Sequence, residues 1–228
     1  MDRSTTTKGI LVSDFDGTLA RHDFFRLVIE RLLPDTVPDY WQQYRTGQIT
    51  HFEAMRLYYS SIRATEAETL RIAESLELVP NLAEWLRRLE QVNWKVIVAS
   101  AGCEWYIRYL LGQQKVEMEV HANPGQFVEG QGLLMRLPID SPYYSPTTGI
   151  DKAAIVRAAQ QTSPRVAFAG DGYPHIAAAR LVPAGLRFAT AALATALQDE
   201  GLSFRYFQRW TDVATALVND ADFPTISA

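Results

Sequence analysis

Three short apolar runs, each followed at once by polar residues, constrain the fold of this chain most strongly. They are GILVS at residues 9–13, WKVIVAS at residues 94–100 and RVAFA at residues 165–169. Their length and β-branched content indicate buried strands, and helical patterns lie between them. Buried strands that alternate with helices form parallel sheets covered on both faces. We therefore predict an α/β fold with a doubly wound parallel sheet, and a fourth strand at LRFAT, residues 186–190.

The stretch between the first two strands is too long for a simple crossover helix. Residues 22–78 show repeated helical spacing of apolar residues and no strand signal. We predict that residues 21–79 form an inserted helical cap, between a first part of the core at 1–20 and a second part at 80–228. Within the second part, short alternating runs at about 116–148 predict a small β-hairpin excursion at the edge of the sheet.

Two further local patterns refine this outline. Thr50 precedes Glu53 by three residues, which is the spacing of a capping box and predicts the start of a cap helix. The segment FRYFQRW, residues 204–210, is expected to belong to one of the closing helices.

Composition narrows the range of partners. A net charge of −4 argues against sequence-independent nucleic-acid binding, which usually needs a basic surface. The single cysteine, Cys103, excludes an internal disulfide and fits a reducing compartment. No apolar run approaches the roughly 18 residues of a membrane helix, and MDRSTTTKG lacks the apolar core of a signal peptide. We expect a cytoplasmic protein that binds neither nucleic acid nor membranes.

The strand ends carry side chains suited to phosphoryl transfer. In doubly wound sheets, reactive groups gather at the carboxyl ends of the strands. Those ends read DFDGT at 14–18, SAG at 100–102 and GDG at 170–172, and Lys152 opens the helix before the third strand. A turn or a surface charge would explain each of these features alone. Their joint occurrence, each at the appropriate end of its element, favours a common site.

Each group in this set has a chemical role in phosphoryl transfer. Asp14 and Asp16 are two residues apart and can divide the work between a nucleophile and a proton shuttle. Together with Asp171 they supply the carboxylate oxygens that Mg²⁺ prefers. Lys152 supplies the positive charge that a transferring phosphoryl group requires. The phosphate group itself would contact hydroxyls and backbone amides of Gly17, Thr18, Ser100, Ala101 and Gly102.

In this order the motifs resemble those of the haloacid dehalogenase-like hydrolases. The resemblance rests on DFDGT, on Ser100 in VIVASAG, on Lys152 in GIDKAAIV and on Asp171 in GDG, and it spans nearly the whole chain. It implies a Rossmann-type core. A helical cap inserted just after the first motif is similar to the phosphoserine phosphatase-like branch. The segment VHANPGQFVEGQG and the loop after it look most like the phosphatases of methionine salvage.

The resemblance implies a two-step hydrolysis of a small-molecule phosphate ester. Asp14 would form an aspartyl-phosphate, and Asp16 would protonate the leaving alcohol and then activate water. Mg²⁺, with Mn²⁺ as the alternative ion, would bind Asp14, the backbone carbonyl of Asp16, and Asp171. Ser100 and Lys152 would be catalytic as well as phosphate-binding.

Two residues are candidates for substrate specificity. In phosphoserine-specific relatives an acid after the first motif and a cap arginine grip the amino acid, and Asp23 and Arg56 are the candidates for these places. The alternatives are that Asp23 caps the following helix and that Arg56 lies on a solvated face. His22, His51 and His121 show no ligand spacing, so no chemistry is assigned to them.

His175 is a departure from the family pattern, which carries a carboxylate at this place. This departure leaves open whether His175 contributes to the metal site. It also motivates an alternative function, in which the chain is a catalytically weak member that binds a phosphorylated ligand or a protein partner. A phospho-accepting receiver domain fits less well, because receivers distribute their acidic residues differently and lack a large helical cap.

Overall fold

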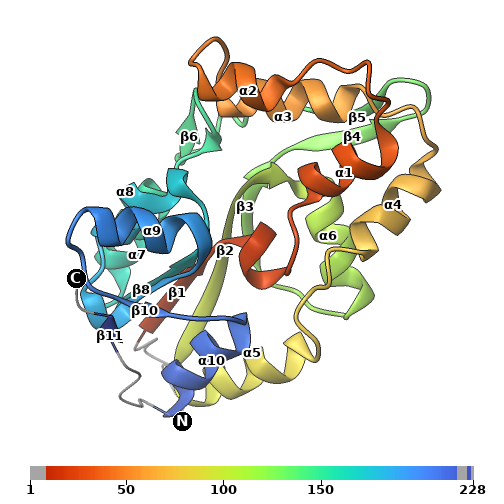
Figure 1. The fold of residues 1–228 in the computed structure, drawn as a ribbon. Coiled ribbons are helices and arrows are strands. Elements are labelled where there is room, and N and C mark those ends of the chain that lie inside the picture. The colour runs from red at the N-terminus through yellow and green to blue at the C-terminus, as the bar shows by residue number, and fades with distance from the viewer. Residues whose placement is uncertain (1–8, 220–224, 227–228) are drawn as a thin grey trace.

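A seven-stranded sheet forms the centre of the computed structural model, which describes residues 9–219 and 225–226 (Figure 1). Its order is β11-β10-β9-β8-β1-β2-β3. The pair β10–β11 is antiparallel and all other neighbours are parallel. The strands are β1 (Gly9–Ser13), β2 (Trp94–Cys103), β3 (Glu119–Asn123), β8 (Val166–Gly170), β9 (Arg187–Ala189), β10 (Phe204–Tyr206) and β11 (Thr225–Ile226).

Helices cover both faces of this sheet because alternate side chains of each strand point to opposite faces. In β1, Leu11 belongs to an apolar cluster shared with α5 and α10, whereas Ile10 and Val12 belong to a second cluster shared with α7 and α9. The predicted α/β class with a doubly wound parallel sheet is confirmed. The helices of the core are α5 (Leu82–Gln91), α6 (Glu104–Gln113), α7 (Lys152–Thr162), α8 (Ile176–Arg180), α9 (Ala191–Asp199) and α10 (Trp210–Asn219).

Four helices occupy the stretch between β1 and α5, and we call them the cap helices. They are α1 (Phe24–Leu32), α2 (Tyr40–Arg45), α3 (His51–Ser60) and α4 (Glu66–Glu74). Figure 1 shows them in orange, gathered beyond the carboxyl ends of the central strands. The two chain segments that lead to and from them pair with each other through an Ala20–Leu78 bridge. The predicted Thr50–Glu53 capping box is confirmed at the start of α3.

Two small antiparallel hairpins accompany the main sheet. One pairs β4 (Gly125–Val128) with β5 (Gly132–Met135), and the other pairs β6 (Tyr144–Ser145) with β7 (Gly149–Ile150). Helix α3 of the cap packs on β5. Its Phe52 N–H also donates to the Thr147 carbonyl, between β6 and β7, at 2.8 Å. The cap therefore contacts the core through both hairpins.

Three local predictions were wrong. Residues 119–123 form β3 of the main sheet, parallel to β2, rather than part of a hairpin. Residues 204–206 form the short strand β10 beside β9, and the closing helix starts only at Trp210. Strand β2 continues to Cys103, three residues beyond its predicted end at Ser100. In each case pairing with a neighbouring strand outweighs the local pattern.

No helix in the described part of the chain combines the length and the apolar character needed to cross a lipid bilayer.

Two short turns carry parts of the site described below. A π-helical turn at Phe15–Leu19 follows β1, and a 3₁₀ turn at Tyr173–His175 leads into α8. A further 3₁₀ turn at Ala184–Leu186 precedes β9.

Candidate active site

Asp14 lies at the end of β1, where it is almost fully buried. Its Oδ1 atom accepts from the Phe15 backbone N–H at 2.8 Å, which fixes the carboxylate against the π-helical turn. Gly17 in this turn has a φ of +68°, and a Cβ there would lie 2.3 Å from Oδ2 of Asp171. Glycine is therefore required at position 17 for two reasons: the backbone conformation and the close approach of Asp171.

Lys152 is the first residue of α7 and reaches Asp14 from the other side. Asp151 caps this helix by accepting from the Ala154 N–H at 3.0 Å, so α7 begins at the site. The Lys152 Nζ atom donates to Oδ1 of Asp14 at 2.5 Å. Burial opposes ionisation of Asp14, but the charge and the hydrogen bond of the Lys152 ammonium outweigh this effect and lower its pKa below the ordinary value. Asp14 is therefore ionised at neutral pH.

Asp16 lies in a different environment. Its Oδ2 atom accepts from the Tyr106 hydroxyl at 2.6 Å, and its Oδ1 atom accepts from the Phe24 N–H at 3.0 Å. Burial outweighs these two hydrogen bonds and raises the pKa of Asp16 to about 7. This carboxyl group can release or take up a proton near neutral pH. It is held between α6 of the core and the first cap helix, α1.

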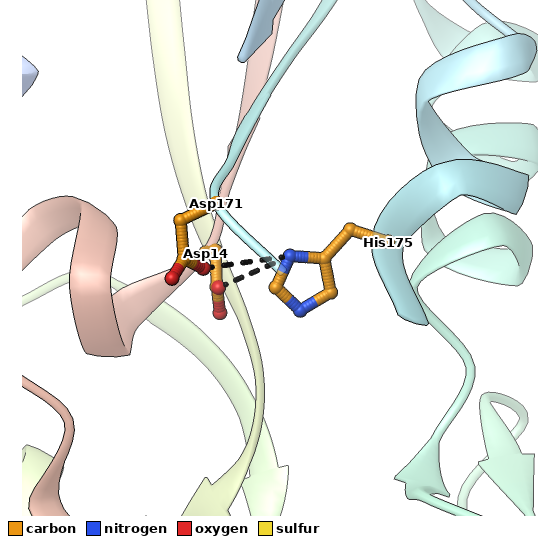
Figure 2. Close-up of side chains that lie close together, drawn as sticks. All are labelled: Asp14, Asp171 and His175. Atoms are coloured by element: carbon orange, nitrogen blue, oxygen red, sulfur yellow. Dashed lines mark ion pairs between the residues drawn. The ribbon is translucent and has the colours of Figure 1, made fainter. Parts of the chain in front are cut away.

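Asp171 and His175 complete a compact group with Asp14, and Figure 2 shows the three side chains facing one another. One ligand atom of each lies within 4.8 Å of the others. Burial, and next the charge of Asp14, raise the pKa of Asp171 to about 9. A divalent cation would offset the repulsion between the two carboxylates, whose hard oxygens are preferred Mg²⁺ ligands. The side chains of Asp14 and Asp171 therefore fit a magnesium site.

The ring of His175 contacts both Lys152 and Asp14. Its Nε2 atom lies 2.7 Å from the Lys152 Nζ atom, and its Nδ1 atom lies 3.3 Å from Oδ2 of Asp14. Burial lowers the pKa of His175 to about 3, so the ring is neutral and accepts at one nitrogen only. The Gly172 backbone N–H donates to Nδ1 at 3.1 Å and the Lys152 ammonium lies within donating distance of Nε2, so the two donors compete for the one acceptor of the neutral ring. His175 thus lies against Lys152 through Nε2, while its Nδ1 atom faces the carboxylates of Asp14 and Asp171.

The predicted motif Ser100-Ala101-Gly102, at the carboxyl end of β2, borders the same site. Ser100 is buried in β2, and its Oγ atom accepts from the Gly102 N–H at 3.0 Å. A Cβ on Gly102 would lie 1.9 Å from the Tyr106 hydroxyl and 3.0 Å from Oδ2 of Asp16. Gly102 therefore leaves the space in which Tyr106 reaches Asp16.

A cavity of about 570 Å³ opens above these residues, between the core and the cap helices. Most of the predicted site residues line it: Asp14, Asp16, Asp23, Ser100, Ala101, Gly102, Lys152, Asp171 and His175. From the cap side it is lined by Phe25, Arg26, Trp41, Tyr44, Arg45, His51, Met55 and Tyr59. The volume lies within the range of small-molecule sites.

Three predicted residues lie elsewhere. Gly17 and Thr18 belong to the π-helical turn but do not line the cavity, and the buried Thr18 Oγ1 atom has no hydrogen-bond partner among the described residues. Arg56 is exposed on α3 and lies outside the cavity lining, in agreement with the alternative that it lies on a solvated face. The structure does not support a role for Arg56 in substrate binding.

Asp23 borders the cavity and forms an ion pair with Arg26 at 2.9 Å. Asp23 precedes α1, but its side chain makes no capping hydrogen bond, which argues against the alternative that it only caps this helix. The arginine paired with Asp23 is thus Arg26 of α1.

Two side chains of the site were missed in the sequence. Tyr106 binds Asp16, although it lies in α6 and belongs to no motif. His51 lines the cavity from the first position of α3. No local sequence pattern marks either residue, because both reach the site through the packing of helices.

Comparisons with known proteins agree with this geometry. The model of the haloacid dehalogenase-like hydrolases matches residues 11–180. A 2-hydroxy-3-keto-5-methylthiopentenyl-1-phosphate phosphatase of Microcystis aeruginosa is 28% identical over 192 residues, which cover 84% of this chain and 89% of the relative. A phosphoserine phosphatase of Vibrio cholerae is 24% identical over 128 residues, 55% of this chain and 39% of that protein.

Solved structures share the fold. A hydrolase of this family from Salmonella enterica superposes with a TM-score of 0.70 at 15% identity, over 95% of this chain and 73% of the other. The phosphoserine phosphatase of T. onnurineus superposes with a TM-score of 0.62 at 18% identity, over 96% of this chain and 98% of the other. The matched region contains Asp14, Ser100, Lys152 and Asp171, and the chain belongs to the haloacid dehalogenase-like hydrolases.

Proposed function

We propose that this protein hydrolyses a small phosphate monoester in two steps, through an aspartyl-phosphate on Asp14. One observation carries the proposal: two neighbouring carboxyl groups have environments that move their pKa values apart. The pKa of Asp14 is lowered beside Lys152, whereas burial raises the pKa of Asp16 to about 7. Such a pair provides an ionised nucleophile and a proton donor at the same pH.

In the first step an Asp14 oxygen bonds to phosphorus and the bond from phosphorus to the ester oxygen breaks. Protonated Asp16 gives its proton to the departing alcohol, and the Tyr106 hydrogen bond keeps its carboxyl group in place. Lys152 and Ser100 border the same part of the cavity and would hold the phosphoryl oxygens.

In the second step water bonds to phosphorus and gives a proton to the Asp16 carboxylate. The bond from phosphorus to Asp14 breaks, which releases inorganic phosphate and restores both carboxyl groups. Asp14, Asp171 and the backbone carbonyl of Asp16 would hold Mg²⁺, which supplies positive charge to the phosphoryl oxygens. Apolar cap side chains over the cavity would limit the access of bulk water.

The alternative of a catalytically weak binding protein rested on His175. Its Nε2 contact holds Lys152 beside Asp14, so the lysine is positioned without the carboxylate that the family resemblance implies at this place. We therefore favour the enzyme.

Hydrolysis of p-nitrophenyl phosphate, of phosphoserine and of 2-hydroxy-3-keto-5-methylthiopentenyl-1-phosphate tests the proposal, with Mg²⁺, with Mn²⁺ and with a chelator. We expect metal-dependent phosphate release. Asp14→Asn should lower kcat at least about a thousandfold, because it removes the nucleophile. Asp199→Asn is the matched control, since Asp199 is exposed at the end of α9. Equal inactivity of wild type and Asp14→Asn would exclude the enzyme, and full activity of Asp14→Asn would exclude the nucleophile.

A further inference from the structure

His51 is the one imidazole that the cap helices place over the catalytic groups in the described part of the chain. It lines the 570 Å³ cavity, and it also lines a second cavity of about 300 Å³ bordered by Ser145 and Thr148. The two cavities meet at His51 and Lys152, among other residues. His51 therefore lies in the wall that the two cavities share, together with Lys152.

The position of His51 is well defined. Its ring meets the ring of Trp41 at a centroid distance of 5.9 Å and an angle of 76°, and the ring of Tyr44 at 5.3 Å and 85°. The next residue, Phe52, is hydrogen-bonded to Thr147 of the core at 2.8 Å. The imidazole is thus fixed relative to both the cap and the core.

One polar atom of this ring, Nδ1, lacks a partner. The Nδ1 atom of His51 is buried and has no hydrogen bond to any described residue. Burial, and next the charge of Lys152, lower the pKa of His51 to about 4, so the ring is neutral at pH 7. A neutral imidazole offers one donor and one acceptor. A buried polar group without a partner is costly, so this atom in a cavity wall calls for a partner that the described residues do not supply.

The surroundings of His51 indicate which ligand groups it meets. Phe25 stacks on Trp41 at 4.8 Å, and together with Met55 they make the cap end of the cavity mainly apolar. The two cap arginines that line the cavity are poor anchors for a buried anion. Arg26 is paired with Asp23, and Arg45 is exposed at the rim.

We propose that His51 is a specificity-determining residue that hydrogen-bonds a hydroxyl or keto oxygen of the leaving alcohol, close to its phosphate ester. The substrate class is then a phosphate ester with such an oxygen near the ester bond and an otherwise apolar remainder packed on Phe25 and Trp41. An α-amino acid ester, with two charges at that end, fits less well. This inference rests on the proposed phosphatase function.

Two synthetic esters test the inference: 2-oxopentyl phosphate and n-pentyl phosphate, which differ only in the keto oxygen. The specificity constant kcat/KM is measured for both with wild type and with His51→Phe, which keeps a ring but removes the nitrogen atoms. We expect His51→Phe to lower kcat/KM about tenfold for the keto ester and less than about twofold for the alkyl ester, mainly through KM. His51→Gln should restore part of the preference. His121→Phe serves as control, because His121 lies outside the cavity.

Equal loss on both esters, or no loss on either, would overturn the role of His51. Loss on the keto ester without any recovery in His51→Gln, together with a lower melting temperature in both variants, would mark a structural role and also overturn it. Hydrolysis of p-nitrophenyl phosphate by wild type without hydrolysis of either pentyl ester would reject the substrate class alone. Inactivity of wild type on every ester would instead reject the phosphatase function.

Discussion

The core end and the cap end of the cavity are built on different principles. At the core end, Asp14, Lys152 and His175 are buried and in direct polar contact with one another. At the cap end, Trp41, Tyr44 and His51 are held by ring contacts, and His51 keeps a buried nitrogen without a partner. The core end is therefore determined by charge and hydrogen bonds, and the cap end by shape.

This difference indicates how chemistry and substrate choice are separated in the molecule. Removal of one charge at the core end leaves its buried partner unpaired, and unpaired buried charges are strongly destabilising. Replacement of a cap side chain changes the fit of the leaving group and leaves the reacting groups in place. Changes at the core end should hence affect every substrate, and changes at the cap end only some.

Lys152→Met is expected to have the largest effect among the variants that sharpen this contrast. It removes the cation 2.5 Å from Oδ1 of Asp14 and one partner of the phosphoryl oxygens. We expect kcat to fall about 100- to 1,000-fold for every ester, and the free energy of unfolding to fall by about 3 kcal/mol. Steady-state kinetics and urea unfolding measure the two effects.

Arg45→Met is the matched control at the cap end, because Arg45 is also a cation that lines the cavity but is exposed. It should change kcat for acetyl phosphate, which has almost no leaving group to contact the cap, by less than about twofold. A loss comparable to that of Lys152→Met would contradict the separation of the two ends.

Tyr106→Phe should have an intermediate effect. The Tyr106 hydrogen bond to Asp16 favours the carboxylate and so lowers the pKa that burial raises to about 7. Without it the pKa of Asp16 should move further up, so that the ionised base needed in the second step is lost at a higher pH. We expect kcat at pH 7 to fall about tenfold for all esters, with the acidic limb of the pH–kcat profile shifted upward. A downward shift would show that Tyr106 does not act through Asp16.

The groups at the core end could be predicted from the sequence because strand ends have a fixed place in a parallel sheet. Asp14 and Asp171 follow β1 and β8, and Ser100 lies near the carboxyl end of β2; these three strands are adjacent in the sheet. Thr18 shows the limit of such reasoning. Its motif suggested a phosphate contact, but the π-helical turn directs its hydroxyl to a buried position away from the cavity.

The cap end was less predictable for a physical reason. Where His51 lies depends on the packing of α3 on β5 and on the hydrogen bond from Phe52 to Thr147, which join segments far apart in the sequence. Arg56, five residues later, lies on the exposed side of the same helix. Likewise β3 and β10 are short strands whose pairing partners, β2 and β9, determine their structure more than their own residues do.

His175→Asp should produce the smallest effect, and it tests whether the core end tolerates another charge. The carboxylate would meet Lys152 as an ion pair and would add a negative charge near Asp14 and Asp171, now 3.3 and 3.7 Å from the His175 Nδ1 atom. Stronger attraction should lower the Mg²⁺ concentration for half-maximal rate by about threefold, because Lys152 offsets part of the added charge. Calorimetric titration with Mg²⁺ should show the same tightening without any substrate. Without metal, three clustered carboxyl groups repel one another, so the melting temperature should fall in chelator and recover with Mg²⁺. An unchanged Mg²⁺ requirement and affinity would mean that His175 contributes only by holding Lys152, and that the charge of this position does not reach the metal site.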